Sequence, residues 1–151
     1  MAEPQETSPS APTTSGRLIK YTAGHYRKAG ISHEDFIHWF THEHLPAAMP
    51  LFKKHNIVKY TLFVTPPEIG AAFGQELSKV YPGWEISDFD CVLEYWMYDL
   101  NALKDMVADP DWAAKAVKDQ DQWCDLSRST VHIGFDTPYL LESGEVVNLP
   151  K

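Results

Sequence analysis

The chain has 151 residues, which is enough for one domain and too short for two. Its net charge of −8 at pH 7 opposes a phosphate backbone, so nucleic acid is not an expected partner. Because no run of about 18 apolar residues occurs, we predict neither a membrane span nor a secretory signal. Cys91 and Cys124 lack the spacing of a disulfide framework or a metal site, and we expect a cytoplasmic protein with free thiols.

Residues 1–15 are rich in Pro, Ser and Thr and, apart from Met1, lack large apolar side chains. Such a segment cannot offset its ordering entropy, and we predict a disordered tail. The remaining sequence predicts a single domain over residues 16–139 and a C-terminal arm over residues 140–151.

The first half of the domain begins with a β-branched and aromatic segment, residues 17–26, that predicts a strand. A helix is predicted from Ser32, whose hydroxyl can accept a hydrogen bond from the amide of Asp35, to about His44. Pro46 and Pro50 interrupt the next segment, so residues 45–55 are predicted to be kinked or to form a second short helix.

Four further segments complete the pattern. Residues 57–65 and 88–98 predict strands, and the connection between them, residues 67–87, is long and apolar enough to suggest a lid. A helix is predicted over residues 100–124 with a break at 109–110, and the last strand over residues 128–136. The resulting βαββαβ order predicts an α+β, ferredoxin-like fold with one bare sheet face, which must meet a partner.

The most specific motif lies between the first strand and the end of the first helix. It combines a basic pair, a glycine turn, a capped helix with a phenylalanine and a histidine before a proline, in the residues Arg27, Lys28, Gly30, Ile31, Ser32, Phe36, His44 and Pro46. This motif resembles that of the EthD-like branch of the dimeric α+β barrel superfamily, although Ala29 stands where the family usually has proline. The resemblance implies a homodimer of paired sheets with one cavity per subunit that binds a flat aromatic or polyketide-like molecule.

His44 is the leading candidate for a catalytic residue. Helical spacing places it on the apolar face of the first helix, with Phe36, Ile37 and Phe40. Its predicted position near the helix C-terminus favours the imidazolium form and hence a proton donor. The resemblance to the family also associates a histidine here with the pocket. The alternative is a core histidine bonded to a carbonyl group.

Alternation along residues 88–98 separates an apolar set, which suits the helix-covered side of the sheet, from Glu94, Trp96 and Tyr98. His132 falls on the same side as Glu94, so we predict that the two share the pocket with His44 and adjust its protonation or hold a phenolic hydroxyl. The alternatives for Glu94 are a structural ion pair with Lys20 or Arg128, or a contact with the dimer partner.

The substrate-binding candidates are residues whose position or chemistry suits a cavity for an aromatic or anionic ligand: Lys20, Tyr21, His25, Phe40, Tyr60, Trp96 and Tyr98. His25 lines the cavity mouth or simply precedes the turn, and the spacing leaves the face of Tyr60 open. His38 and His42, at positions i and i+4, form a possible metal pair, but no third ligand has diagnostic spacing. We therefore predict no metal and no cofactor.

The resemblance predicts a cofactor-independent lyase that acts on an aromatic polyketide acid, most readily a decarboxylase. Such an enzyme needs a group that protonates the ring carbon, here His44, and an apolar pocket that disfavours the substrate carboxylate. A cyclase or dehydratase would use the same histidine as a base, and a cofactor-free monooxygenase would bring a phenolate to oxygen. The remaining alternative, from another class, is a non-catalytic ligand-binding or scaffold dimer.

Overall fold

The structure is a computed structural model, and it describes residues 16–151; the tail predicted over residues 1–15 lies outside the described part. Four strands form one antiparallel sheet in the order β2-β3-β1-β4. Their bounds fall within the predicted segments and are Ile19–His25 for β1, Lys59–Val64 for β2, Cys91–Met97 for β3 and Thr130–Gly134 for β4. This topology is the ferredoxin-like sheet that the βαββαβ order predicted.

The first helical layer is longer than predicted. It consists of α1 (His33–Trp39), the π-helical segment η1 (Phe40–His44) and α2 (Leu45–Lys54), joined end to end without a loop. The predicted cap is confirmed, because the Asp35 amide donates to the Ser32 hydroxyl at 3.1 Å.

The predicted helix end at His44 is wrong. The amide of Leu45 bonds to the carbonyl of Phe40, five residues earlier, so the chain widens by one residue per turn just before Pro46. Pro46 then falls in the first turn of α2, where a missing amide donor costs little, and the helix continues.

The second helical layer is broken, as predicted, at Asp109. It comprises α4 (Asn101–Ala108), the π-helical η2 (Trp112–Ala116), the short α5 (Gln120–Trp123) and a 3-10 turn η3 (Leu126–Arg128). The Asp109 carboxylate accepts hydrogen bonds from Lys54 at 2.7 Å, from His55 at 2.8 Å and from the Asp111 amide at 3.0 Å. It thereby fastens the end of α2 to the second layer.

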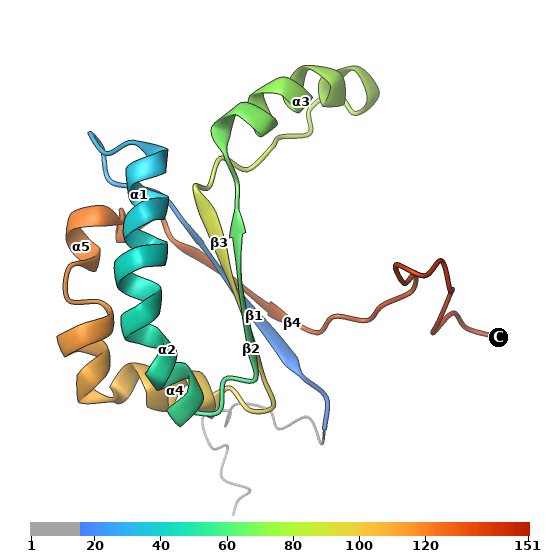
Figure 1. Cartoon of the computed structure of the whole chain (residues 1–151). Helices are drawn as coiled ribbons and strands as arrows, with labels where there is room; N and C mark the ends of the chain where they lie inside the picture. Colours follow the sequence, from blue (N-terminus) through green and yellow to red (C-terminus); the bar gives the residue numbers. More distant parts are fainter. Residues whose placement is uncertain (1–15) are drawn as a thin grey trace, which may run out of the picture.

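The connection predicted as a lid contains a helix, α3 (Pro67–Val80), which buries none of its residues against the rest of the chain. Figure 1 shows α1, α2, α4 and α5 on one side of the sheet, whereas α3 and the C-terminal arm extend away from that layer. Among residues 16–151, the helices are all too short or too polar to cross a bilayer.

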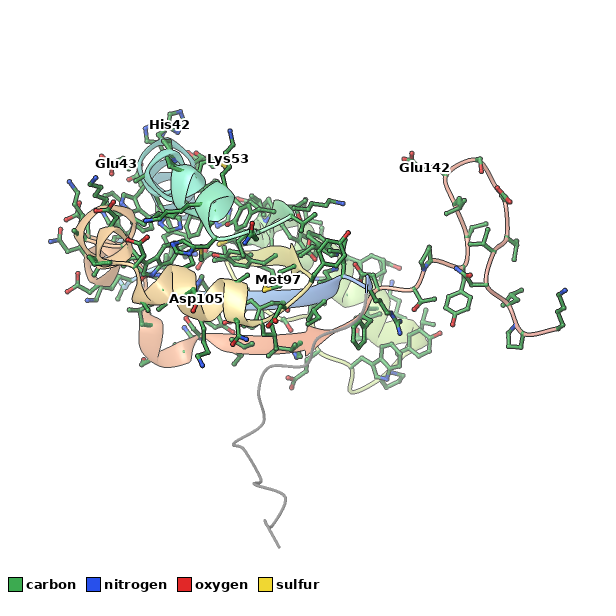
Figure 2. The ribbon with its side chains drawn as sticks, turned by 90° about the horizontal axis from the view of Figure 1, so that it is seen from below. His42, Glu43, Lys53, Met97, Asp105 and Glu142 are labelled. Atoms are coloured by element: carbon green, nitrogen blue, oxygen red, sulfur yellow. The ribbon has the colours of Figure 1, made fainter. Side chains whose placement is uncertain are left out.

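The core lies between the helices and one face of the sheet. The apolar set on β3, Cys91, Leu93, Tyr95 and Met97, is buried on this face as alternation predicted. Figure 2 shows Met97 beneath the helices, with His42, Glu43 and Lys53 on their outer surface. Both cysteines are buried and free.

The basic turn of the motif has a structural role in this fold. Asp90, which is 3% exposed, accepts hydrogen bonds from the Arg27 amide at 2.8 Å, from the Arg27 guanidinium at 2.5 Å and from His33 at 2.8 Å. These contacts join the end of β1, the start of β3 and the first turn of α1. Because the carboxylate is buried and fully paired, its removal would leave the hydrogen-bond donors of Arg27 and His33 without an acceptor.

Replacing Asp90 by alanine should lower the free energy of unfolding by about 2–4 kcal/mol, because it removes a buried acceptor and leaves the partly buried donors of Arg27 and His33 without a partner. Urea titration followed by circular dichroism measures the change. Asp111→Ala, which removes a half-exposed carboxylate paired with Lys115, should cost less than about 1 kcal/mol. An equal decrease in the free energy of unfolding for the two variants would show that the contacts of Asp90 do not stabilise the fold more than an exposed ion pair does.

Candidate active site

A pocket of about 250 Å³, partly open to solvent, lies between the helix-covered face of the sheet and the second helical layer of the protomer. Its volume is slightly below the range of about 300–1,000 Å³ that is usual for small-molecule sites. Its wall is mostly apolar and aromatic, with two histidines, and is formed by Tyr21, Ala23, His25, His44, Leu93, Tyr95, Leu103, Met106, Val107, Trp112, Gln120, Ser129 and Val131. A larger open depression of about 790 Å³, around residues 53–58 and 98–105, is separate from these histidines.

His44 is the last residue of η1 and is 3% exposed. Its Nδ1 lies 2.8 Å from the carbonyl oxygen of Ala116 in η2. The Ala116 carbonyl is available to His44 because the amide of Gln120, which would bond to it in a regular α-helix, donates to the carbonyl of Val117 instead. Since a carbonyl oxygen only accepts hydrogen bonds, Nδ1 must carry the proton. In the neutral ring, Nε2 then holds the lone pair available to a ligand.

Aromatic rings hold the imidazole of His44 in this orientation. Its ring centroid lies 4.6 Å from that of Phe40, 5.6 Å from Trp39 and 6.1 Å from Trp112. Phe40, a predicted substrate-binding residue, is fully buried and supports the histidine from behind, outside the cavity lining.

The environment of His44 favours the neutral ring. Burial lowers its pKa below the ordinary value of 6.5, and the hydrogen bond to Ala116 opposes that shift only in part. The predicted support for an imidazolium from a helix C-terminus is wrong, because the helix continues through α2 to Lys54 and His44 lies in its middle. At neutral pH the imidazole of His44 is therefore mainly uncharged.

His25, at the end of β1, is the second histidine of the cavity and is 7% exposed. Its Nδ1 lies 2.6 Å from the hydroxyl of Ser129, which precedes β4. Burial, and then the proximity of His44, lower the pKa of His25 to about 4. Both rings are thus uncharged at neutral pH.

Three tyrosines cross the same sheet face in one row, because Tyr95 pairs with Tyr60 on β2 and with Tyr21 on β1. Tyr21 and Tyr95 line the cavity with their rings 5.8 Å apart and edge to face. Tyr60 stands behind them, stacked on Phe52, and its hydroxyl is buried without a hydrogen-bond partner among the residues described. Burial raises the pKa of Tyr21 and Tyr95, so both remain neutral phenols.

The predicted grouping of Glu94 and His132 with His44 is wrong. Register pairs Thr22 with both Glu94 and His132, so these side chains share one sheet face, and it is opposite to the face of Tyr95 and the cavity. Alternation identified correctly which residues share a face. The prediction placed the cavity on the bare face of the sheet, whereas the structure has it between the helix-covered face and the second helical layer.

Glu94 instead takes part in a cross-strand ion pair, the alternative that the sequence left open. Its carboxylate lies 2.9 Å from the Lys20 ammonium and accepts a hydrogen bond from Thr61 at 2.8 Å. Partial burial raises the pKa of Glu94, but the bonds from Lys20 and Thr61 outweigh it and hold the pKa below the ordinary value.

Three predicted substrate-binding residues also lie away from the cavity. Lys20 and Trp96 are on the bare face, where the ammonium sits 5.1 Å from the indole centroid and Trp96 donates to Asp136 at 3.1 Å. Tyr98 lines the open depression at the other end of β3. Of the predicted set, the structure brings His44, His25 and Tyr21 together.

Sequence reasoning missed Tyr95, Trp112, Gln120 and Ser129 as cavity residues. Alternation had already assigned Tyr95 to the helix side, which would have identified it once the cavity was placed there. No spacing pattern marks the other three, because Trp112 and Gln120 come from the irregular second layer and Ser129 from the connection between η3 and β4. His38 and His42 stack with their ring centroids 3.9 Å apart on the exposed side of the helix, and the described residues include no cluster of three potential metal ligands.

The His25 environment predicts an acid-sensitive fold. The unfolded chain takes up a proton near pH 6.5 and the folded chain near pH 4, so stability is full above pH 6.5 and is lost as the pH falls through that window. Between pH 7 and pH 5 the free energy of unfolding should fall by about 2 kcal/mol through this residue. Urea titrations at both pH values measure it. His25→Gln should show a smaller fall, and an identical fall in both proteins would refute the assignment.

Comparison with known proteins adds the family. Residues 28–127 match the model of the EthD domain. The dehydratase iacD of Pestalotiopsis fici is 47% identical over 135 residues, which cover 89% of this chain and 96% of that protein. The decarboxylase AgnL1 of Paecilomyces divaricatus is 25% identical, with 97% of both chains covered.

Among solved structures, SnoaB of Streptomyces nogalater, a cofactor-independent oxygenase, superposes with a TM-score of 0.52. It is 12% identical to this chain, and the match covers 84% of this chain and all of SnoaB, a likeness that concerns the fold alone. The family match spans the motif from Lys28 to Pro46, the strands β2 and β3, and most of the second helical layer. The chain therefore belongs to the EthD domain family.

Proposed function

We propose that the chain is a dehydratase that removes water from a cyclic β-hydroxy ketone derived from an aromatic polyketide, with His44 as the general base. The observation that carries the proposal is the bond from His44 Nδ1 to the Ala116 carbonyl, in a site that lowers the pKa of the ring. Together they leave an uncharged imidazole with a free Nε2 lone pair. The relative at 47% identity, named a dehydratase, supports the same reaction class.

In the proposed reaction, Nε2 of His44 takes the proton from the carbon between the ketone and the carbon that bears the hydroxyl. The electron pair of that C–H bond passes to the ketone oxygen as an enolate. The pair then returns to form a C=C bond while the C–O bond breaks, and the imidazolium gives its proton to the leaving hydroxyl. One water is released, and His44 ends in its starting state.

The other polar groups of the cavity suit the enolate. Tyr21 is a neutral phenol in the wall and can donate a hydrogen bond to the developing oxyanion. His25, positioned by Ser129, supplies a second uncharged polar contact without placing a positive charge beside His44. The apolar remainder of the wall, including Trp112, fits a planar ring and keeps water from the intermediate.

The predicted decarboxylase remains the second candidate, supported by the 25% identical relative of that name. It requires His44 to enter the reaction as an imidazolium that protonates a ring carbon. The lowered pKa of His44 leaves little of that form at neutral pH. The cofactor-free oxygenase and the non-catalytic dimer stay predictions of the sequence without a specific contact in their favour.

Replacing His44 by glutamine should reduce dehydration by about 100- to 10,000-fold, the usual contribution of a general base. The assay supplies a hydroxylated tetralone, with its hydroxyl β to the ketone, and follows naphthol formation by absorbance against an enzyme-free blank. His42→Gln alters an exposed histidine two residues away and should leave the rate within about twofold. Unchanged turnover in folded His44→Gln would remove this residue from the mechanism.

The pH dependence separates the two candidates. Because a base must be deprotonated, dehydration should be constant from pH 7 to pH 8 and fall on the acid side with a pKa below 6.5. A decarboxylase using the imidazolium would lose activity as the pH rises. Measuring kcat/KM from pH 5 to pH 8.5, over times shorter than acid unfolding, gives the profile. An activity that rises toward acid pH would contradict the proposed role.

A further inference from the structure

Helix α3 and its return segment expose an apolar surface that the rest of the protomer leaves uncovered. Ile69, on this helix, is 67% exposed, and the helix buries none of its residues. The large apolar side chains of this surface, which we call the α3 face, are Ile69, Phe73, Val80, Tyr81, Trp84 and Ile86. At its base, where the helix meets β2, lies an apolar groove of about 470 Å³ bordered by Phe63, Pro67 and Phe89.

The C-terminal arm presents a second such surface. Residues 138–151 form a folded hairpin, with the Leu141 amide bonded to Glu145, the Val147 amide to Tyr139 and the Asn148 side chain to Pro138. Leu140 is nevertheless 70% exposed. The exposed large apolar side chains of this hairpin are Tyr139, Leu140, Leu141, Val146 and Leu149. Figure 2 shows Glu142 at its tip, far from the helices and the sheet.

The root of the arm is fixed to the sheet, so the hairpin is held out in a defined direction. The Arg17 guanidinium lies 4.2 Å from the Phe135 ring centroid and donates to Thr137 at 3.0 Å, while Trp96 donates to Asp136 at 3.1 Å. A hairpin that is ordered, anchored at its base and apolar at its end is preorganised for a partner.

The sheet topology places the two surfaces at diagonally opposite corners. β2 and β4 are the edge strands. α3 follows the end of β2 at Val64, in the row of Cys91 and His25, whereas the arm follows the end of β4 at Gly134, in the row of Lys20. Figure 1 shows both segments extending away from the helical layer, so that they flank the bare face.

The sequence predicts a homodimer in which a second copy packs on the bare face. Within that dimer, we propose that the C-terminal hairpin of each copy docks on the α3 face of the other. When two sheets face one another, a two-fold axis along the second diagonal carries each α3 corner onto the partner's arm corner. The contact is then isologous and closes as a dimer, with each hairpin contact made twice. Adjacent strands would cross at a large angle, as in orthogonal sheet packing.

A second copy of the chain would cover the α3 face and the hairpin in the same contact. A different protein that covered one of these surfaces would have no reason to cover the other. The α3 face and the hairpin together hold eleven exposed large apolar side chains. Single proteins rarely leave apolar patches larger than about 300–600 Å² uncovered. The chain therefore carries both halves of one contact, and association would remove both apolar surfaces from water together. This inference is independent of the proposed reaction, because the cavity lies on the other face of the sheet.

Disulfide trapping tests the contact. A tagged chain with Phe73→Cys is coexpressed with an untagged chain with Leu140→Cys, and the purified protein is oxidised mildly and run on a non-reducing gel. We expect a covalent heterodimer as the main product, because the native Cys91 and Cys124 are buried and do not compete. The matched control pairs Leu140→Cys with Lys118→Cys, which is exposed on the helical side, and should give no cross-link.

Two outcomes would overturn the proposal. One is the absence of the heterodimer, and the other is an intramolecular disulfide when both cysteines are placed in one chain, which would mean that the hairpin folds onto its own α3. Sedimentation of Leu140→Asp gives an independent readout, with an expected rise of at least tenfold in the dimer dissociation constant. Leu126→Asp, which alters another exposed leucine in η3 on the helical side, should leave that constant unchanged.

Discussion

The hydrogen bond between His44 Nδ1 and the Ala116 carbonyl is the constraint on which the site depends. It joins residues 72 positions apart, each at the end of a π-helical segment, and so ties the first helical layer to the second across the cavity. The widened backbone at η1 turns His44 inward, and the loosened chain after η2 frees the carbonyl that receives it. With a regular α-helix at η1 or after η2, the His44 imidazole and the Ala116 carbonyl would not form this hydrogen bond.

That same bond sets the tautomer of His44, because it fixes which ring nitrogen holds the proton. Burial alone would only make His44 neutral, with either tautomer allowed. The carbonyl acceptor removes this choice, and the rings of Trp39 and Phe40 prevent the imidazole from turning over. His25 shows the contrast, since its hydroxyl partner Ser129 can donate or accept and therefore leaves the tautomer free to follow the ligand.

Much of the fold could be predicted from local chemistry. The Ser32 cap, the alternation on β3 and the break at Asp109 each follow from interactions within a few residues, and all are present. The run of helix past Pro46 could not be predicted, because it depends on a π-type hydrogen bond that spacing does not encode. Alternation likewise shows which residues share a face and is silent on where the cavity lies. Glu94 and His132 were therefore grouped correctly with each other and wrongly with His44.

The polar character of the bare face is compatible with its burial in a dimer. Lys20 and Glu94 already neutralise one another at 2.9 Å, and Thr61 satisfies a further lone pair of the carboxylate. The indole of Trp96 in turn donates to Asp136. Burying a charge costs most when it is unpaired, so groups that are paired within each protomer lose less on association than isolated ions would. Association then draws on the exposed apolar surface of α3 and the hairpin, while the paired row between them can be covered without leaving an unpaired charge.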